Sequence, residues 1–333
     1  MNAQAVEALS VHYLTRSREL AALRPEWEAL WMRSSRPTPF NAPAWLIPWW
    51  RTFGNGCLRV CTIRKEGRLV GILPAYLLEG RLQLVGVGMS DYLDVLAERD
   101  LEKDVAEIVL LSTTILQKEW RETEFQNLAS GSPLLECGRP PWWRDERFAQ
   151  DVCPGIALPR SVFELASTLP PGQYRNYSYS RRRIEREEPF SLERGTAGGF
   201  QEACEGLFRL HREQWKARGT TGVVTGQTSS FLKKGIEGLQ RMGVTRWHLM
   251  RHRGEIVGVL LGFALRKRFH YYISGVHPGF RKYGVGNVLV GDALHRAVEE
   301  GHEIFDFLRG GESYKYSWGA VDQPLWSRIV REN

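Results

Sequence analysis

Apolar and polar residues alternate in two well-separated parts of the chain, and glycine turns interrupt the alternation. Each part holds three such stretches, at 57–63, 66–78 and 81–88 in the first and at 244–250, 253–265 and 268–276 in the second. A period of two between tight glycine turns is typical of β-hairpins. The pattern therefore predicts a three-stranded antiparallel meander in each half of the chain.

The two meanders are copies of one another. A shift of 187 residues brings Gly67 onto Gly254 and aligns EGRLVGILPAYLL at 66–78 with RGEIVGVLLGFAL at 253–265. Helical periodicity precedes each meander, around 19–33 and 43–53 in the first half and around 200–217 and 229–241 in the second. Two copies of one α/β domain explain this order.

The repeat sets the expected domain boundaries. The chain should divide between residues 150 and 165, into an N-terminal domain at 1–158 and a C-terminal domain at 159–333. Gly, Thr and Ser in 219–230 predict a mobile loop between two helices of the second copy, placed to close over a substrate.

Composition narrows the classes of protein that fit. The 333 residues include 43% hydrophobic and 25% charged ones, as in ordinary globular proteins. We expect a cytoplasmic protein with no membrane insertion, because no apolar run is long enough to span a bilayer and the start lacks a signal-peptide pattern. The net charge of +7 suits an anionic partner.

The cysteine and histidine patterns argue against a metal. The five cysteines form an odd, scattered set without a C-x-x-C pair, which predicts reduced thiols and neither a disulfide framework nor a zinc site. His248 and His252 lie on and just past a strand rather than along one helix, so no metal is assigned.

One segment carries a candidate anion site. In residues 276–301, Arg281, Gly284 and Gly286 fit the pattern [QR]-x-x-G-x-[GA] directly before an amphipathic helix that begins at 284–286. Glycines there let the backbone approach a ligand, and the free N–H groups of the helix start favour a diphosphate. The strand predicted at 303–308 completes the strand–helix–strand context. The alternative is a glycine-rich turn into a packed helix.

At these residues the sequence resembles the GNAT superfamily of acyl-CoA transferases. The run GHEIFDFLRGGESYKYSWG at 301–319 is similar to a signature of its CelD/BcsL-type acetyltransferases, which are associated with cellulose and exopolysaccharide clusters. The segments 43–50, 70–74 and 91–94 also look like that branch, so the resemblance covers most of the chain. Many relatives have Ser-Pro-Gly where this chain has Tyr283, Gly284 and Val285.

The resemblance implies a fold and a cofactor. The fold is α/β with a mixed sheet, in tandem GNAT-like domains that each have a mostly antiparallel sheet flanked by helices, and the cofactor is acetyl-CoA or another acyl-CoA. The implied cofactor-binding residues are Ser274, Val276, Arg281, Tyr283, Gly284, Val285, Gly286 and Asn287. The first copy lacks the R-x-x-G-x-G pattern, so we expect a degenerate domain that supports the other or helps to shape the acceptor cleft.

Acyl transfer needs a base, an oxyanion donor and an acid for the leaving thiolate. Asp306 lies between apolar strand neighbours and is the candidate base; the alternative is a structural acid that pairs with Arg309 or Lys315 or bonds the following Gly-Gly loop. Tyr314 is the candidate acid by resemblance, and Tyr316 is its rival.

Two further residues complete the catalytic candidates. Lys315 could contact an anionic substrate or cofactor, unless it is simply exposed. His211, on the apolar face of the helix at 200–217, could act as base or touch the acceptor, unless it is a packed core histidine.

The segment 174–187 interleaves tyrosines with arginines and resembles a polyanion-binding patch, although a solvated basic helix face fits equally. The leading hypothesis is an acyl-CoA-dependent N- or O-acyltransferase for a small polar acceptor such as a sugar, with nucleic acid not expected as a partner. One alternative is a FemAB-like transferase that takes an aminoacyl group from tRNA. The other is a non-catalytic acyl-CoA-binding scaffold.

Overall fold

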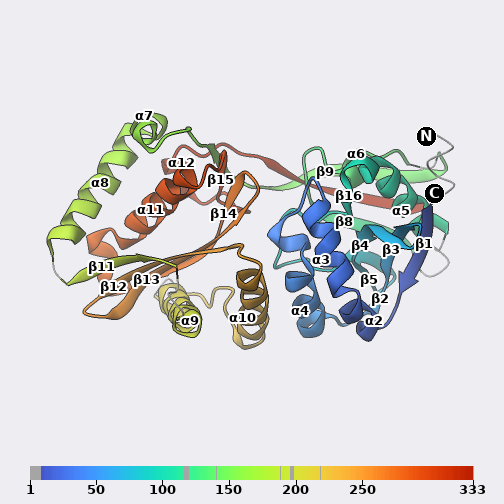
Figure 1. The fold of residues 1–333 in the computed structure, drawn as a ribbon, viewed down its shortest axis with the longest axis horizontal. Coiled ribbons are helices and arrows are strands. Elements are labelled where there is room, and N and C mark those ends of the chain that lie inside the picture. Colours follow the sequence, from blue (N-terminus) through green and yellow to red (C-terminus); the bar gives the residue numbers. More distant parts are fainter. Residues whose placement is uncertain are drawn as a thin grey trace. The chain divides into compact units, whose positions relative to one another are not determined.

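The computed structural model describes residues 9–115, 120–139, 141–187, 189–195, 199–217 and 219–332. The chain forms two compact units, residues 1–152 with 323–333 and residues 153–322. Each unit combines mostly antiparallel sheet with flanking helices (Figure 1). This confirms the predicted α/β fold class. No helix among the described residues has both the length and the apolar character needed to cross a bilayer.

The first unit holds two sheets, in the orders β1-β3-β4-β7 and β2-β5-β6-β8-β16-β9. Its strands are β1 Leu9–Leu14, β2 Cys57–Leu58, β3 Val60–Lys65, β4 Arg68–Leu73, β5 Ala75–Leu78, β6 Arg81–Leu84, β7 Leu96–Ala97, β8 Glu122–Ala129, β9 Trp143–Val152 and β16 Pro324–Glu332. Its helices are α2 Ser17–Ala22, α3 Arg24–Arg33, α4 Pro43–Phe53, α5 Glu102–Ile115 and α6 Pro133–Glu136, with 3-10 turns η1 Pro39–Asn41 and η2 Arg99–Leu101.

The second unit holds one six-stranded sheet in the order β10-β15-β14-β13-β12-β11. Its strands are β10 Gly155–Ala157, β11 Phe190–Arg194, β12 Thr245–His252, β13 Glu255–Leu265, β14 Arg268–Val276 and β15 Ile304–Asp306. Its helices are α7 Leu165–Thr168, α8 Pro171–Arg186, α9 Phe200–Lys216, α10 Gly226–Arg241, α11 Val285–Glu299 and α12 Ser313–Ser317, with 3-10 turns η3 Val162–Glu164 and η4 Pro278–Tyr283. Helices α8 and α11 cover one face of the sheet, and α9 and α10 cover the other (Figure 1).

The predicted repeat is present in three dimensions. In the first unit β3 pairs with β4 and β5 pairs with β6, as β12 pairs with β13 and β13 with β14 in the second. The continuous three-stranded meander predicted for both halves is present only in the second unit. The hairpin turns match as well, because Glu66 and Gly67 have φ of 50° and 80°, and Arg253 and Gly254 have 52° and 81°. Positive φ at both central residues is the turn that suits the twist of antiparallel strands.

A proline makes the two copies differ. In the second unit β13 runs unbroken for 11 residues, whereas in the first unit Pro74 separates β4 from β5. Proline lacks the N–H that a strand donates to its neighbour, so it interrupts the ladder. Strands β4 and β5 consequently belong to different sheets.

Four predicted boundaries need correction. The strand predicted at 303–308 ends at Asp306, because Leu308 takes a left-handed φ of 59°. The third strand of the first copy ends at Leu84, and the loop predicted at 219–230 ends where α10 begins at Gly226. Residues 323–333, expected in the C-terminal domain, belong to the first unit, because β16 pairs with β8 and β9 there.

Candidate functional site

Strands β14 and β15 separate after a short parallel pairing. They pair only from Arg268 with Ile304 to His270 with Asp306, whereas β14 stays paired with β13 as far as Val276. A register shift in the β13–β14 pair leaves Tyr272 as an extra residue, two positions after His270, the last β14 residue that pairs with β15. Such a bulge bends a strand and increases its twist. Residues beyond His270 on β14 thus present an edge that β15 does not cover.

Backbone groups of β14 point toward this uncovered edge. The N–H of His277 donates to Val257 O on β13 at 2.9 Å, so strand alternation directs Val276 and Ser274 the other way. The N–H of Val276 donates to Gln214 Oε1 of α9 at 2.9 Å. The structure therefore places both strand residues predicted to bind cofactor at the edge, and adds Gln214, which sequence reasoning missed. The sequence does contain one sign of this residue: Gln214 is a polar amide on the otherwise apolar face of α9.

Helix α11 starts beside the same edge, as predicted. Gly284 caps the helix with a left-handed φ of 73°, and Val285 begins it. A Cβ on Gly284 would lie 2.3 Å from Ser180 Oγ of α8, so close packing of the two helices also requires this glycine. This contact supports the alternative reading of Gly284 as a packing residue.

Gly286 differs from Gly284 because no neighbour in the described part of the chain requires a glycine there. It has helical backbone, and a Cβ would meet only Val276 Cγ2, at 3.8 Å. Open space at the first turn of a helix, beside the edge of β14, leaves room for a ligand to approach the backbone N–H groups. Gly286 is therefore the glycine of the motif that fits a binding role.

Helix α8 contacts the other predicted loop residues. Gln173 donates to Asn287 Oδ1 at 3.0 Å. The guanidinium of Arg183 lies 4.7 Å from the ring centre of Tyr283 and donates to Lys282 O at 3.1 Å. Arg281 is exposed. No pattern in the residues of α8 or of the loop indicates that the two pack together.

Asp306 is fully buried and paired. Arg268 Nη1 donates to its Oδ2 at 2.6 Å, and the Leu308 N–H donates to its Oδ1 at 2.8 Å. Arg268 is thus a partner of Asp306 that the sequence did not indicate, and Lys315 binds the carbonyl oxygens of the following loop instead. A carboxylate with both oxygens engaged by the protein stabilises the end of β15, so the geometry offers it no route to an acceptor.

Lys315 is also buried, against the expectation of an exposed side chain. Its Nζ donates to the carbonyl oxygens of Leu308, Arg309 and Gly310 at 2.9 Å each and lies 2.8 Å from Glu312 Oε2. This ammonium therefore fixes the loop between β15 and α12.

Tyr314 lies on the first turn of α12, where that loop places it near the open edge. It is 41% exposed, and its ring centre is 6.3 Å from that of Tyr271 and 6.1 Å from that of Phe307. Its rival Tyr316 donates instead to Asp322 Oδ1 at 2.7 Å. The structure thus brings Tyr314 to β14 and gives Tyr316 a surface contact.

His211 is buried on α9 against the end of β14. A Cβ on Gly275 would lie 2.7 Å from the His211 backbone nitrogen, so helix and strand are in contact. The indole N–H of Trp215 donates to His211 Nε2 at 2.9 Å. That bond occupies the Nε2 lone pair a general base would use.

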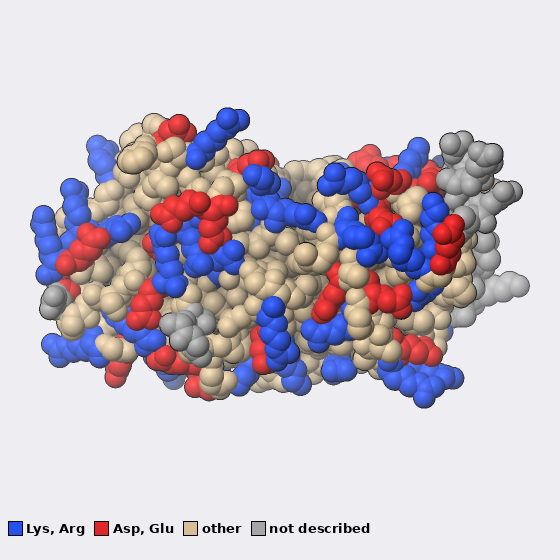
Figure 2. Space-filling view, in the orientation of Figure 1, with Lys and Arg blue, Asp and Glu red and all other residues tan. Residues whose placement is uncertain are grey.

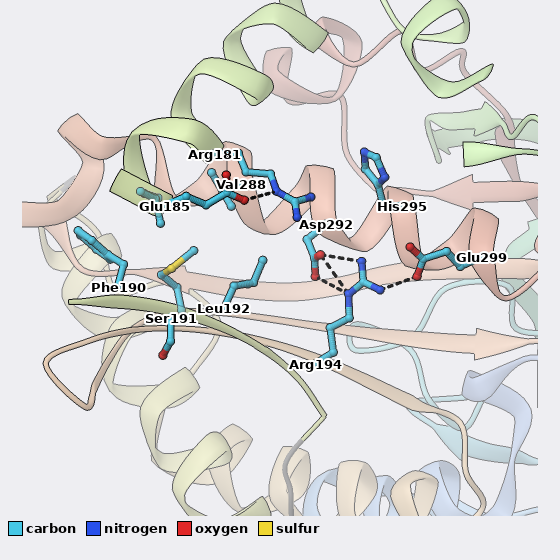
Figure 3. Close-up of a pocket in the computed structure, with 12 residues that line it drawn as sticks. Arg181, Glu185, Phe190, Ser191, Leu192, Arg194, Val288, Asp292, His295 and Glu299 are labelled. Atoms are coloured by element: carbon cyan, nitrogen blue, oxygen red, sulfur yellow. Dashed lines mark hydrogen bonds and ion pairs between the residues drawn. The ribbon is translucent and has the colours of Figure 1, made fainter. Parts of the chain in front are cut away.

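A cavity of about 620 Å³ lies on the other side of α11, between α8 and β11 (Figure 3). Arg194 holds the buried Asp292 at 2.7 Å and Glu299 at 2.5 Å, and His248 Nδ1 lies 2.6 Å from Asp292 Oδ2. Burial would raise the pKa of Asp292, but hydrogen bonds from His248 and Arg194 outweigh it and hold that pKa below its usual range. This network ties α11 to β11 and β12.

Within the described part of the chain, no group of three His, Cys, Asp or Glu residues could hold a metal ion. His248 pairs with Asp292 rather than joining His252. The five cysteines, which all lie in described segments, form no disulfide with one another.

Comparison with known proteins gives both a family match and a fold. Residues 172–316 match the family described as the acetyltransferase (GNAT) domain. No curated protein matches the chain in sequence. Among solved structures, FemX is similar with a TM-score of 0.65 at 11% identity, covering 96% of both chains.

Two further structures resemble the chain over most of its length. The C-terminal domain of a putative lysylphosphatidylglycerol synthetase from Agrobacterium fabrum has a TM-score of 0.61 at 10% identity, covering 93% of this chain and 92% of that one. L-PGS from Bacillus licheniformis has a TM-score of 0.59 at 13% identity, covering 92% and 91%. Identities this low show a shared fold alone. Residues 172–316 are therefore similar in sequence to the acetyltransferase (GNAT) domain, and the separation of β14 from β15 and the start of α11 lie within this matched segment.

Proposed function

We propose that this protein is an acyl-CoA-dependent N- or O-acyltransferase that carries an acetyl group to a small polar acceptor such as a sugar or polysaccharide precursor. The observation that carries the proposal is the opening between β14 and β15, which ends at the unobstructed Gly286. The similarity of residues 301–319 to the CelD/BcsL-type branch supports the acceptor class. Acetyl-CoA is a cytosolic metabolite, so we infer a cytoplasmic site of action.

The edge of β14 suits the extended arm of coenzyme A. That arm carries amide groups, which can form hydrogen bonds with the backbone of Ser274 and Val276. The arm would then pair with the edge of β14 in the way that an additional strand does. The diphosphate then lies at the start of α11, where Gly286 leaves the N–H groups accessible and Arg281 supplies positive charge. In the free protein the Val276 N–H donates to Gln214 Oε1, and coenzyme A takes the place of this side chain when it binds.

Transfer then needs few side chains. The amine or hydroxyl of the acceptor attacks the thioester carbonyl, a backbone N–H of β14 stabilises the oxyanion, and the C–S bond breaks, while the proton that the acceptor loses passes through water to the phenolate left on Tyr314. Tyr314 donates its phenolic proton to the departing thiolate. Asp306 and Lys315 hold the loop that carries Tyr314, through Arg268 and through the three carbonyl oxygens.

Release of thiol from acetyl-CoA, measured across a panel of amino sugars and sugar alcohols, tests the proposal. Replacing Tyr314 by Phe should lower turnover by about 100-fold, the usual contribution of a general acid, and leave the Kd for CoA unchanged. Tyr316→Phe is the matched control and should keep wild-type turnover. Equal turnover in both variants would refute the role of Tyr314.

A FemAB-like transferase dependent on aminoacyl-tRNA is the second candidate. Two observations favour it. The chain resembles FemX over almost its whole length. In addition, Gly284 packs against Ser180, so one glycine of the motif has a packing role instead of a cofactor-binding one. A chain that binds no CoA yet transfers an amino acid from charged tRNA would establish it. A scaffold would bind acyl-CoA and leave it intact with every acceptor.

A further inference from the structure

The outward face of α8 carries a continuous row of exposed side chains that the transfer reaction does not use. The row consists of Arg175, Tyr179, Arg182 and Arg186, all exposed and spaced four, three and four residues apart. This spacing keeps the four side chains on one face of a helix, over a length of about 16 Å. We call these residues the α8 stripe.

The opposite face of α8 fixes the orientation of the stripe. Tyr177, Ser180 and Ile184 are buried, and Ser180 and Tyr177 pack into the space left by Gly284 and Gly291 of α11. Because these contacts hold the helix by its inner side, the stripe must face solvent. Figure 2 shows Lys and Arg side chains gathered along the margin of the molecule where α8 lies in Figure 1.

The acidic residues of this helix are not placed to neutralise the stripe. Glu185 pairs with Arg181 at 2.9 Å, and Glu187 pairs with Arg183 at 2.8 Å, both on the flanks of α8. Among the described residues, Arg175, Arg182 and Arg186 take part in no ion pair. A helix face that serves only solubility usually intersperses both signs, whereas this one keeps a single sign.

The positive surface continues beyond the helix. Arg183 joins α8 to η4 by its hydrogen bond to Lys282 O and by its position over the Tyr283 ring. Arg281 and Lys282 are both exposed there. The basic surface therefore extends from the stripe to the loop before α11.

The chemistry of the stripe fits a strand of nucleic acid with unpaired bases. We propose that the α8 stripe binds the phosphodiester backbone of such a strand through Arg175, Arg182 and Arg186, and that Tyr179 stacks on a base. Guanidinium groups form paired hydrogen bonds to phosphate, and exposed tyrosines between basic residues provide stacking platforms. Tyr179 is 64% exposed, which leaves its ring accessible.

A lipid surface fits the stripe less well. Helices that lie on membranes insert an apolar face, and the apolar face of α8 is already buried on α11. The stripe itself holds no aliphatic side chain. The proposal is independent of the acyl-transfer function, because the stripe residues are exposed and none of the steps assigned to the edge of β14 uses them.

Fluorescence anisotropy with a labelled single-stranded 20-mer, as RNA and as DNA of the same sequence, tests the proposal at several salt concentrations. The triple variant Arg175→Gln/Arg182→Gln/Arg186→Gln should bind at least 10-fold more weakly near 0.1 M salt. Its slope of log affinity against log salt should shrink by about 2, since each phosphate contact on a single strand contributes about 0.7. Tyr179→Ala should weaken binding about 10-fold and leave the slope unchanged.

The control variant Arg18→Gln/Arg51→Gln/Arg99→Gln removes three exposed arginines of the first unit and changes the net charge equally. It should keep wild-type affinity, and comparison of RNA with DNA identifies the preferred strand. The proposal is overturned if the wild type binds neither strand, or if the control loses as much affinity as the stripe variant. It is equally overturned if anionic phosphatidylglycerol vesicles or polyglutamate, and not nucleic acid, bind in a stripe-dependent way.

Discussion

Asp306 Oδ2 accepts a hydrogen bond from Arg268 Nη1 at 2.6 Å, and this ion pair joins β15 to β14 at the point where the two strands begin to separate. The carboxylate is fully buried, whereas the Arg268 side chain is 30% exposed. The strongest sequence candidate for a general base is thus part of the structure that holds the opening in shape.

Replacing Asp306 by Asn should therefore act on stability. Removing one partner of a buried pair leaves the other charge uncompensated and costs about 3 kcal/mol in the free energy of unfolding. Urea denaturation measures the loss, with Glu303→Gln, whose side chain is 70% exposed, as the control. An Asp306→Asn variant as stable as the wild type but inactive would show that Asp306 acts in catalysis after all.

Lys315→Met should also destabilise the protein. The substitution keeps the length of the side chain but leaves the carbonyl oxygens of Leu308, Arg309 and Gly310 buried without their donor, which costs about 3 kcal/mol. Lys267→Met, at an exposed position, should change the free energy of unfolding by less than about 0.5 kcal/mol. Chemical denaturation of both variants checks this, and equal stabilities would contradict the assigned role of Lys315.

Gly284 and Gly301 offer a matched comparison, because both have a φ of 73° and only Gly284 is crowded. Alanine at Gly301 should cost about 1 kcal/mol for the left-handed backbone alone. Alanine at Gly284 should cost about 2 kcal/mol more, because its Cβ overlaps Ser180. Adding Ser180→Gly should restore the extra loss. Thermal unfolding measures all four proteins, and no rescue by Ser180→Gly would contradict the packing.

Acid should destabilise the second unit through His270. This side chain is fully buried, and burial lowers its pKa to about 4. In the unfolded chain His270 takes up a proton below about pH 6.5. The free energy of unfolding should therefore fall by up to about 3 kcal/mol as the pH drops from 6.5 to 4. His270→Gln should flatten this dependence in denaturation curves, and an unchanged slope would contradict it.

The sequence predicted features that depend on local pattern. The turns at Gly67 and Gly254, the helix start at Gly284 and the strand at 268–276 all follow from periodicity and glycine position, and the structure has each of them. These signals extend over a few residues, so they are independent of the rest of the fold.

Contacts between residues far apart in the sequence could not be predicted from local patterns. Arg268 and Asp306 are 38 residues apart, and Ser180 meets Gly284 across more than a hundred residues. Strand β16 alternates as any strand does, and nothing in its residues indicates that it pairs with β8 and β9. Which glycine packs and which leaves space for a ligand depends on helix α8, so the motif alone gave both residues one role.

Calorimetric titration with acetyl-CoA tests the central claim most directly, with the wild type beside Gly286→Leu. Leucine at 286 has room for its Cβ and suits a helix, so folding should be unaffected, while the longer side chain fills the space beside Val276. We expect one site per chain in the wild type and at least 10-fold weaker binding in the variant. A wild type that binds no acetyl-CoA, or a variant that binds it equally well, would contradict the proposed site.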